Sequence, residues 1–192
     1  MWVIQRKLVF IAHPKMASRA VRDTIRHLGA VQVGSHHAIE PTRLEQEKKR
    51  GASVGCIIRN PYDVMVSWYF HMEVRKRTEV MEFEPWLMDI LPKGNGYIEH
   101  GLFPGVPFCD TVMRFETLNR DWREWSGKCR IAFRPLEMVG PSIKRDHKHY
   151  SHFYNDATRE AVATKFHEEI CYGGYTFEED PCIDSQKTEA SS

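Results

Sequence analysis

The chain has 192 residues, of which 42% are hydrophobic and 28% are charged. This composition suits one compact domain and excludes a disordered chain. Lys and Arg number 27 against 26 Asp and Glu, a net charge of +1, which argues against a nucleic-acid protein held mainly by bulk charge and against a polybasic membrane binder.

The predicted elements alternate along most of the chain. In chain order we expect a strand over 3–12 (strongest over 8–12), a helix over 19–28, a strand over 30–33, a helix over 42–50, a strand over 53–58, a helix from 61, a helix over 83–91, a loop over 97–107, a strand over 111–115, a helix over 118–125, a strand over 129–133 and a helix over 156–171. Several ends carry local signals. Gly29 stops the first helix, Thr42 and Glu45 form a capping box, and Asn60-Pro61 supplies a cap and a first helical position.

This alternation predicts a single α/β domain with a central parallel sheet of four to five strands and helices on both faces. We place the domain at residues 1–178 and expect a polar, disordered tail over 179–192. Ligands of such folds bind at the carboxyl ends of the strands. The candidate segments are therefore 13–19, 34–40 and 59–67.

Targeting and redox signals are few. No apolar run reaches the length of a membrane span, and charges interrupt the apolar start of the chain, so we expect neither a membrane helix nor a signal peptide. The five cysteines are widely spread, without CxxC spacing, which favours a reduced, cytoplasmic protein.

The first candidate loop is His13-Pro-Lys-Met-Ala-Ser-Arg-Ala20, between a strand and a helix. Backbone N–H groups at a helix N-terminus, together with Lys15, make an anion site that suits phosphate or a related group. The segment is not a Walker A motif, because GxxxxGK[ST] is absent. The alternative is a surface loop with Ser18 as a helix cap.

The second candidate segment follows the strand over 53–58. Arg59 stands at the carboxyl end of that strand, and Ser67 lies two turns into the next helix, on one stripe with Asp63 and His71. A guanidinium fork and a hydroxyl suit a second phosphate. The alternatives are an ion pair of Arg59 with Asp63 and a small helix residue at Ser67.

These segments resemble two motifs of sulfotransferases that use 3′-phosphoadenosine-5′-phosphosulfate (PAPS). The loop from His13 resembles the 5′-phosphosulfate loop, and Arg59-Asn-Pro-Tyr-Asp-Val-Met-Val-Ser-Trp-Tyr69 resembles the element whose Arg and Ser bind the 3′-phosphate. Residues 112–118 and 150–177 are similar to later parts of the family. The resemblance implies a P-loop-like three-layer sandwich, and a donor site made of Lys15, Met16, Ala17, Ser18, Arg19, Arg59 and Ser67.

The sequence departs from the family pattern in places. Ala17 stands where Gly is more frequent, and Arg19 where many members have Thr or Ser. The Gly-rich third PAPS motif of the cytosolic phenol-type members is missing. The basic stretch that includes Lys144 and Arg145 either replaces it near the 3′-phosphate or is a solvated loop. The membrane anchor and lumenal stem of the family's Golgi members are also missing, which favours a soluble, minimal enzyme.

The resemblance implies in-line transfer of a sulfuryl group from PAPS to a hydroxyl or amine of a small-molecule or carbohydrate acceptor. Lys15 would neutralise charge on the bridging oxygen, and a base must take the acceptor's proton. We predict His36 or His37 as this base, with a slight preference for His37, and keep Glu40 and Glu116 as further candidates.

We expect no metal, no nucleic acid and no membrane among the partners, and PAPS as the sulfate donor. The alternatives are a small P-loop-type nucleotide kinase and a non-catalytic nucleotide-binding module. Trp86, Tyr97 and Phe103 are apolar candidates for the acceptor wall or, equally, for the core. The sequence determines neither the acceptor nor the oligomeric state.

Overall fold

The computed structural model describes residues 1–35, 37, 39–75, 81–94, 98–137 and 148–178. Two compact units divide the chain: residues 1–59 with 100–139 form the first unit, and residues 60–99 with 140–192 form the second. No helix of the described residues is long and apolar enough to cross a membrane.

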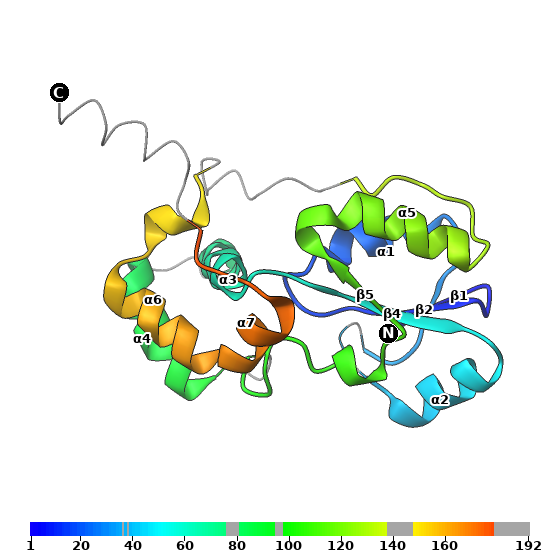
Figure 1. Cartoon of the computed structure of the whole chain (residues 1–192), viewed down its shortest axis with the longest axis horizontal. Helices are drawn as coiled ribbons and strands as arrows, with labels where there is room; N and C mark the ends of the chain where they lie inside the picture. The colour runs from blue at the N-terminus through cyan, green and yellow to red at the C-terminus, as the bar shows by residue number, and fades with distance from the viewer. Residues whose placement is uncertain (36, 38, 76–80, 95–97, 138–147, 179–192) are drawn as a thin grey trace. The chain divides into compact units, whose positions relative to one another are not determined.

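The first unit is built on an open, five-stranded sheet with the order β3-β1-β2-β4-β5 (Figure 1). Its strands are β1 (Trp2–Ile4), β2 (Leu8–Ile11), β3 (Val31–Gln32), β4 (Ser53–Ile58) and β5 (Thr111–Arg114). Strands β2, β4 and β5 are parallel, whereas β1 is antiparallel to both β2 and β3. The predicted α/β class is confirmed, but the predicted all-parallel sheet is wrong, because the sheet is mixed.

The sheet is mixed because the expected strand over 3–12 is a hairpin. Lys7 N–H donates to the Ile4 carbonyl at 2.9 Å, and the two residues between them, Gln5 and Arg6, have φ of 48° and 56°. Hairpin turns with positive φ at both central residues are usually formed by Asn-Gly or Asp-Gly. Gln5 and Arg6 are not residues typical of such a turn, so the sequence pattern does not indicate that the chain reverses here.

The expected strand over 129–133 is also absent. Ile131 N–H donates to the Ser126 carbonyl at 2.9 Å, and Trp122 Nε1 donates to the Arg134 carbonyl at 3.0 Å. The segment after α5 (Leu118–Lys128) therefore bonds to that helix instead of adding to the sheet. Its apolar residues pack against a helix, which a pattern of hydrophobicity does not distinguish from packing in a sheet.

Helices lie over both faces of the sheet in the first unit. Figure 1 shows α1 (Ser18–Arg26) and α5 over one face and α2 (Pro41–Lys49) over the other. Helix α2 begins at Pro41, and its N-cap is Glu40, whose side chain makes no cap hydrogen bond. The predicted capping box needs Thr42 at the N-cap, but Thr42 lies inside the helix, so the box does not form. Pro at the first helical position leaves no N–H to cap there.

The second unit is helical in its described part, with α3 (Pro61–Arg75), α4 (Phe83–Lys93), the short 3₁₀ turn η4 (Tyr150–Phe153), α6 (Asp156–Lys165) and α7 (His167–Gly173). The predicted start of α3 is confirmed: Asn60 Oδ1 accepts from Tyr62 N–H at 3.1 Å, and Pro61 follows the cap. The helix expected over 156–171 is interrupted at Phe166, a buried residue with φ −115° and ψ 32°.

Candidate functional site

The loop between β2 and α1 has an unusual backbone. Lys15 and Ala17 have φ of 63° and 52°, left-handed values that residues other than glycine rarely adopt. Ala17 is the N-cap of α1, no side chain caps the helix, and its first turn contains no acidic residue. The first N–H groups of a helix have no partner within the helix. This terminus therefore presents both N–H donors and the positive end of the helix dipole, an arrangement that suits an anion.

The predicted donor-binding residues of this loop differ in exposure. Lys15, Ala17 and Ser18 are partly exposed and Arg19 is exposed, whereas Met16 is 1% exposed. The Met16 side chain belongs to the core, so only its backbone could contact a ligand. Ser18 is the first helical residue rather than the cap, which corrects the alternative interpretation of this loop.

Arg59 links the loop to the ends of two strands. Its guanidinium Nη1 donates to the Lys15 carbonyl at 2.9 Å, and its Cζ lies 3.9 Å from the centre of the Phe115 ring. Phe115 is close because Ile58 pairs with Arg114 in the β4–β5 register. Arg59 is 8% exposed. These contacts give it a structural role in holding the left-handed loop, which sequence reasoning missed because both contacts are long-range.

His37 lies beside the end of β2. Its Nδ1 is 2.7 Å from the Ala12 carbonyl, so the neutral ring carries its proton on Nδ1 and Nε2 is the basic nitrogen. Partial burial lowers the pKa of His37 below its usual value. The ring is thus neutral at physiological pH and stands next to the residue that precedes the loop. His36, the other predicted base, lies outside the described residues.

His13 holds the start of the loop in place, a structural role that sequence reasoning missed. Nδ1 donates to the Ile57 carbonyl at 3.1 Å, and Nε2 accepts from Gly105 N–H at 3.0 Å. The side chain is 2% exposed, and burial lowers its pKa to about 4. This neutral imidazole joins the ends of β2 and β4 to the loop at Gly105. The sequence shows only a histidine after a strand, with no signal for either partner.

The carboxylates kept as alternative bases occupy two different places in the first unit. Glu116 is exposed in η2 (Phe115–Thr117), directly after β5, and Glu40 is partly exposed just before α2. Phe103, a candidate for the acceptor wall, is buried, with its ring centre 6.5 Å from that of His13.

Other predicted residues lie in the second unit. Ser67 is on α3 and partly exposed, as are Asp63 and His71, whereas the other residues over 61–70 are buried. The predicted polar stripe of this helix is therefore confirmed. Trp86 packs against Tyr69 and Phe83. Tyr97, Lys144 and Arg145 lie outside the described residues.

Charge is segregated between the two units. In the first unit 17 Lys and Arg stand against 9 Asp and Glu, whereas the second has 10 against 17. The near-zero net charge of the chain hides this division. The loop between β2 and α1 belongs to the basic unit, which favours anionic ligands there.

Comparison with known proteins adds no assignment. No protein-family model matches the chain, and no curated protein matches it in sequence. Within the described residues, no three His, Cys, Asp or Glu side chains group as a metal site would require.

Proposed function

We propose that the protein is a PAPS-dependent sulfotransferase with a P-loop-like fold. It moves a sulfuryl group to a hydroxyl or amine of a small-molecule or carbohydrate acceptor. The observation that carries the proposal is the left-handed loop of Lys15 and Ala17, which leads into an α1 terminus without a side-chain cap in a basic unit. This supports the sequence resemblance to the phosphosulfate loop.

Each proposed role uses a chemical property of the residue. The α1 N–H groups and Ser18 bind the phosphosulfate, and the Lys15 ammonium neutralises charge that grows on the bridging oxygen as its bond to sulfur breaks. Arg59 contacts the 3′-phosphate and also keeps its bond to the Lys15 carbonyl. The proposed role of Ser67 at the 3′-phosphate is supported by the sequence resemblance alone.

His37 is the proposed general base. Its Nε2 takes the proton of the acceptor as the acceptor oxygen or nitrogen bonds to sulfur, and 3′,5′-adenosine bisphosphate (PAP) leaves. The hydrogen bond from Nδ1 to the Ala12 carbonyl fixes the ring and the tautomer. Such positioned bases contribute about 10²–10⁴ in rate. The lowered pKa keeps the base unprotonated at neutral pH.

Binding of PAP without magnesium is the first test. Thermal unfolding is followed with PAP alone and with ATP plus Mg²⁺. At a concentration ~100 times its dissociation constant, PAP should stabilise the protein by about 2.7 kcal/mol. A clear shift with ATP–Mg²⁺ and none with PAP would overturn the proposal in favour of a kinase.

Lys15 supplies the second test, which separates an enzyme from a binding module. Turnover is measured with labelled PAPS against sugars, phenols and amines. Lys15→Ala should lower turnover by about 10²–10³ while weakening PAP much less. If PAP stabilises the protein but no acceptor is sulfated, the non-catalytic module is the correct interpretation.

The base is tested by a matched pair of neighbouring variants. His37→Ala should reduce turnover by about 10²–10⁴ and leave the PAP dissociation constant unchanged, whereas His36→Ala should be mild. If both variants keep normal turnover across neutral pH, the base is elsewhere, and Glu116→Gln is the next variant to measure.

A further inference from the structure

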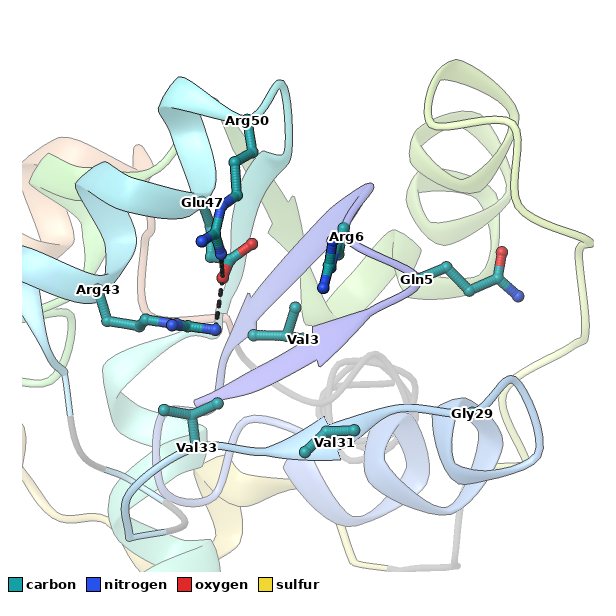
Figure 2. Close-up of a pocket in the computed structure, with 9 residues that line it drawn as sticks. All are labelled: Val3, Gln5, Arg6, Gly29, Val31, Val33, Arg43, Glu47 and Arg50. Atoms are coloured by element: carbon teal, nitrogen blue, oxygen red, sulfur yellow. Dashed lines mark hydrogen bonds and ion pairs between the residues drawn. The ribbon is translucent and has the colours of Figure 1, made fainter.

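A hollow of about 300 Å³ lies between β1, β3 and α2 in the first unit (Figure 2). Arg6, Arg43 and Arg50 line it together with Val3, Val31 and Val33. Its volume is at the lower end of the range for small-molecule sites, ~300–1,000 Å³. We name it the arginine hollow.

The arginine hollow is separate from the loop between β2 and α1. The turn that holds Arg6 precedes β2, and the loop with Lys15 follows it. Because β2 has four residues, its two ends are about 10 Å apart, and no residue of the loop lines the hollow. A ligand in the arginine hollow is therefore not the proposed PAPS, and the inference stands independently of the proposed function.

Glu47 organises two of the three guanidinium groups. Its carboxylate is 1% exposed, and its Oε1 accepts from Arg43 Nη2 at 2.7 Å and from Arg50 Nη1 at 3.0 Å. Figure 2 shows this carboxylate among the three arginine side chains. A guanidinium has five N–H donors, and these contacts use one from each arginine. With one carboxylate and three guanidinium groups, the lining of the hollow has a net positive charge.

Two buried polar atoms of this cluster have no hydrogen-bond partner among the described residues. They are a donor, Arg43 Nε, and an acceptor, Glu47 Oε2. Unsatisfied buried groups are uncommon in folded proteins and costly when charged. Their occurrence in two residues that line the same hollow indicates a polar occupant, with a small adjustment of these side chains on binding.

Arg6 reaches the hollow from a strained position. It has φ 56° in the hairpin turn, and it makes no ion pair or hydrogen bond with the described residues. A left-handed arginine costs energy that glycine or asparagine would not. The residue carries a positive charge to the lining of the hollow, where the charges of Arg43 and Arg50 already lie.

We propose that the arginine hollow binds a small organic oxyanion, with a phosphate or carboxylate group held by Arg6 and Arg50 and an apolar body against the three valines. Guanidinium forks match the paired oxygens of both groups. A hydroxyl or amino group on the ligand would donate to Glu47 Oε2, which accepts from none of the described residues.

The test uses the intact chain with labelled valine methyl groups. It is titrated with inorganic phosphate, phenyl phosphate and benzoate, with sodium chloride as the ionic-strength control. The methyl signals of Val3, Val31 and Val33 should move saturably with an organic anion. The stronger of the two organic ligands identifies phosphate or carboxylate as the preferred group, and inorganic phosphate shows whether the apolar body contributes.

Variants assign the response to the arginines. Arg6→Ala should weaken binding by at least about tenfold, and Arg6→Lys should restore only part of the affinity because it lacks the fork. Lys7→Ala is the matched control, because Lys7 is a cation in the same turn that does not line the hollow, and it should be nearly neutral. Lys15→Ala should also leave this binding unchanged, which separates the hollow from the proposed nucleotide loop.

Two results would overturn the proposal. One is the absence of saturable valine shifts with every organic anion while sodium chloride has the same effect. The other is an equal affinity of the Arg6→Ala and Lys7→Ala variants, since binding would then not depend on Arg6. The remaining valine signals, such as that of buried Val54, show in both cases that each variant is folded.

Discussion

At the scale of single residues, His13 and Ala17 determine how the loop after β2 is held. His13 joins three segments through one neutral ring, with backbone groups on both nitrogens. Ala17 occupies a left-handed conformation at the cap of α1. Neither residue needs a ligand to explain its contacts, yet both define where the N–H groups of α1 and the Lys15 carbonyl lie.

The buried His13 makes stability depend on pH. Its folded pKa is about 4 against 6.5 for the free side chain, so the unfolded chain binds more protons between these values. The free energy of unfolding therefore falls as the pH decreases from about 6.5 to 4, by about 3 kcal/mol from this group. Urea unfolding at several pH values measures the loss.

The matched variant for this prediction is His13→Asn, which retains a donor near the position of Nδ1 and cannot be protonated. Its unfolding free energy should be lower at neutral pH but should change less between pH 6.5 and 4 than that of the wild type. Equal slopes for the two proteins would show that other groups cause the pH dependence.

Relief of strain at Ala17 is a second prediction at this scale. Glycine adopts the left-handed conformation without the Cβ clash, so Ala17→Gly should raise the free energy of unfolding by about 1 kcal/mol. The control, Ala20→Gly, lies inside α1 and should lower it by about 1 kcal/mol. Thermal unfolding would contradict the prediction if both variants were destabilised equally.

At the scale of secondary-structure elements, α5 packs on β4 through one close contact. A Cβ built on Gly55 would lie 2.6 Å from Cζ2 of Trp125, and Trp125 Nε1 donates to Ser53 Oγ at 3.0 Å. The indole thus occupies the space above the strand that a side chain at position 55 would need. Glycine in the middle of β4 is explained by this approach of the helix.

Gly55→Ala should therefore destabilise the protein by about 1–3 kcal/mol through overpacking. Trp125→Phe in the same chain should recover part of this loss, since it removes the ring atoms nearest to the new methyl group. Gly127→Ala is the control: it lies in α5, where a Cβ meets nothing within 4 Å, and should be neutral or stabilising. Denaturant unfolding of the wild type, Gly55→Ala, Trp125→Phe and the double variant completes the cycle, and Gly127→Ala is measured beside them.

At the scale of the whole molecule, the segregation of charge is the main electrostatic feature. Lys and Arg are in excess in the first unit, and Asp and Glu are in excess in the second. The two excesses nearly cancel, which gives the chain its net charge of +1. The argument from net charge against nucleic acid applies to the chain as a whole and not to its basic unit. The absence of nucleic-acid partners stays a prediction.

The basic unit predicts salt-dependent binding of the proposed nucleotide. The affinity for PAP should fall by about tenfold as ionic strength rises from about 0.05 M to 0.5 M, because the Debye length shrinks. Adenosine 5′-phosphate, which lacks the 3′-phosphate, should show a smaller slope in the same calorimetric titration. Equal slopes would mean that the 3′-phosphate does not contact charged groups of the protein.

The sequence by itself determined the elements whose signals are local. The apolar runs before Ala12 and Arg59 became β2 and β4, Asn60-Pro61 began α3, and Gly29 followed α1 at φ 75°. The position of the candidate loop at a strand's carboxyl end followed from these elements. Such features depend on residues a few positions apart, so periodicity and capping chemistry reveal them.

The tertiary structure decided what depends on residues far apart in the chain. It reversed the chain at Gln5 and Arg6, and it placed the 131–137 segment along α5 instead of in the sheet. It also set Arg59 on the Lys15 carbonyl, 44 residues away. Strand direction and side-chain partners are chosen by the packing of the whole unit, which gains more from burying apolar surface and pairing polar groups than any local preference contributes.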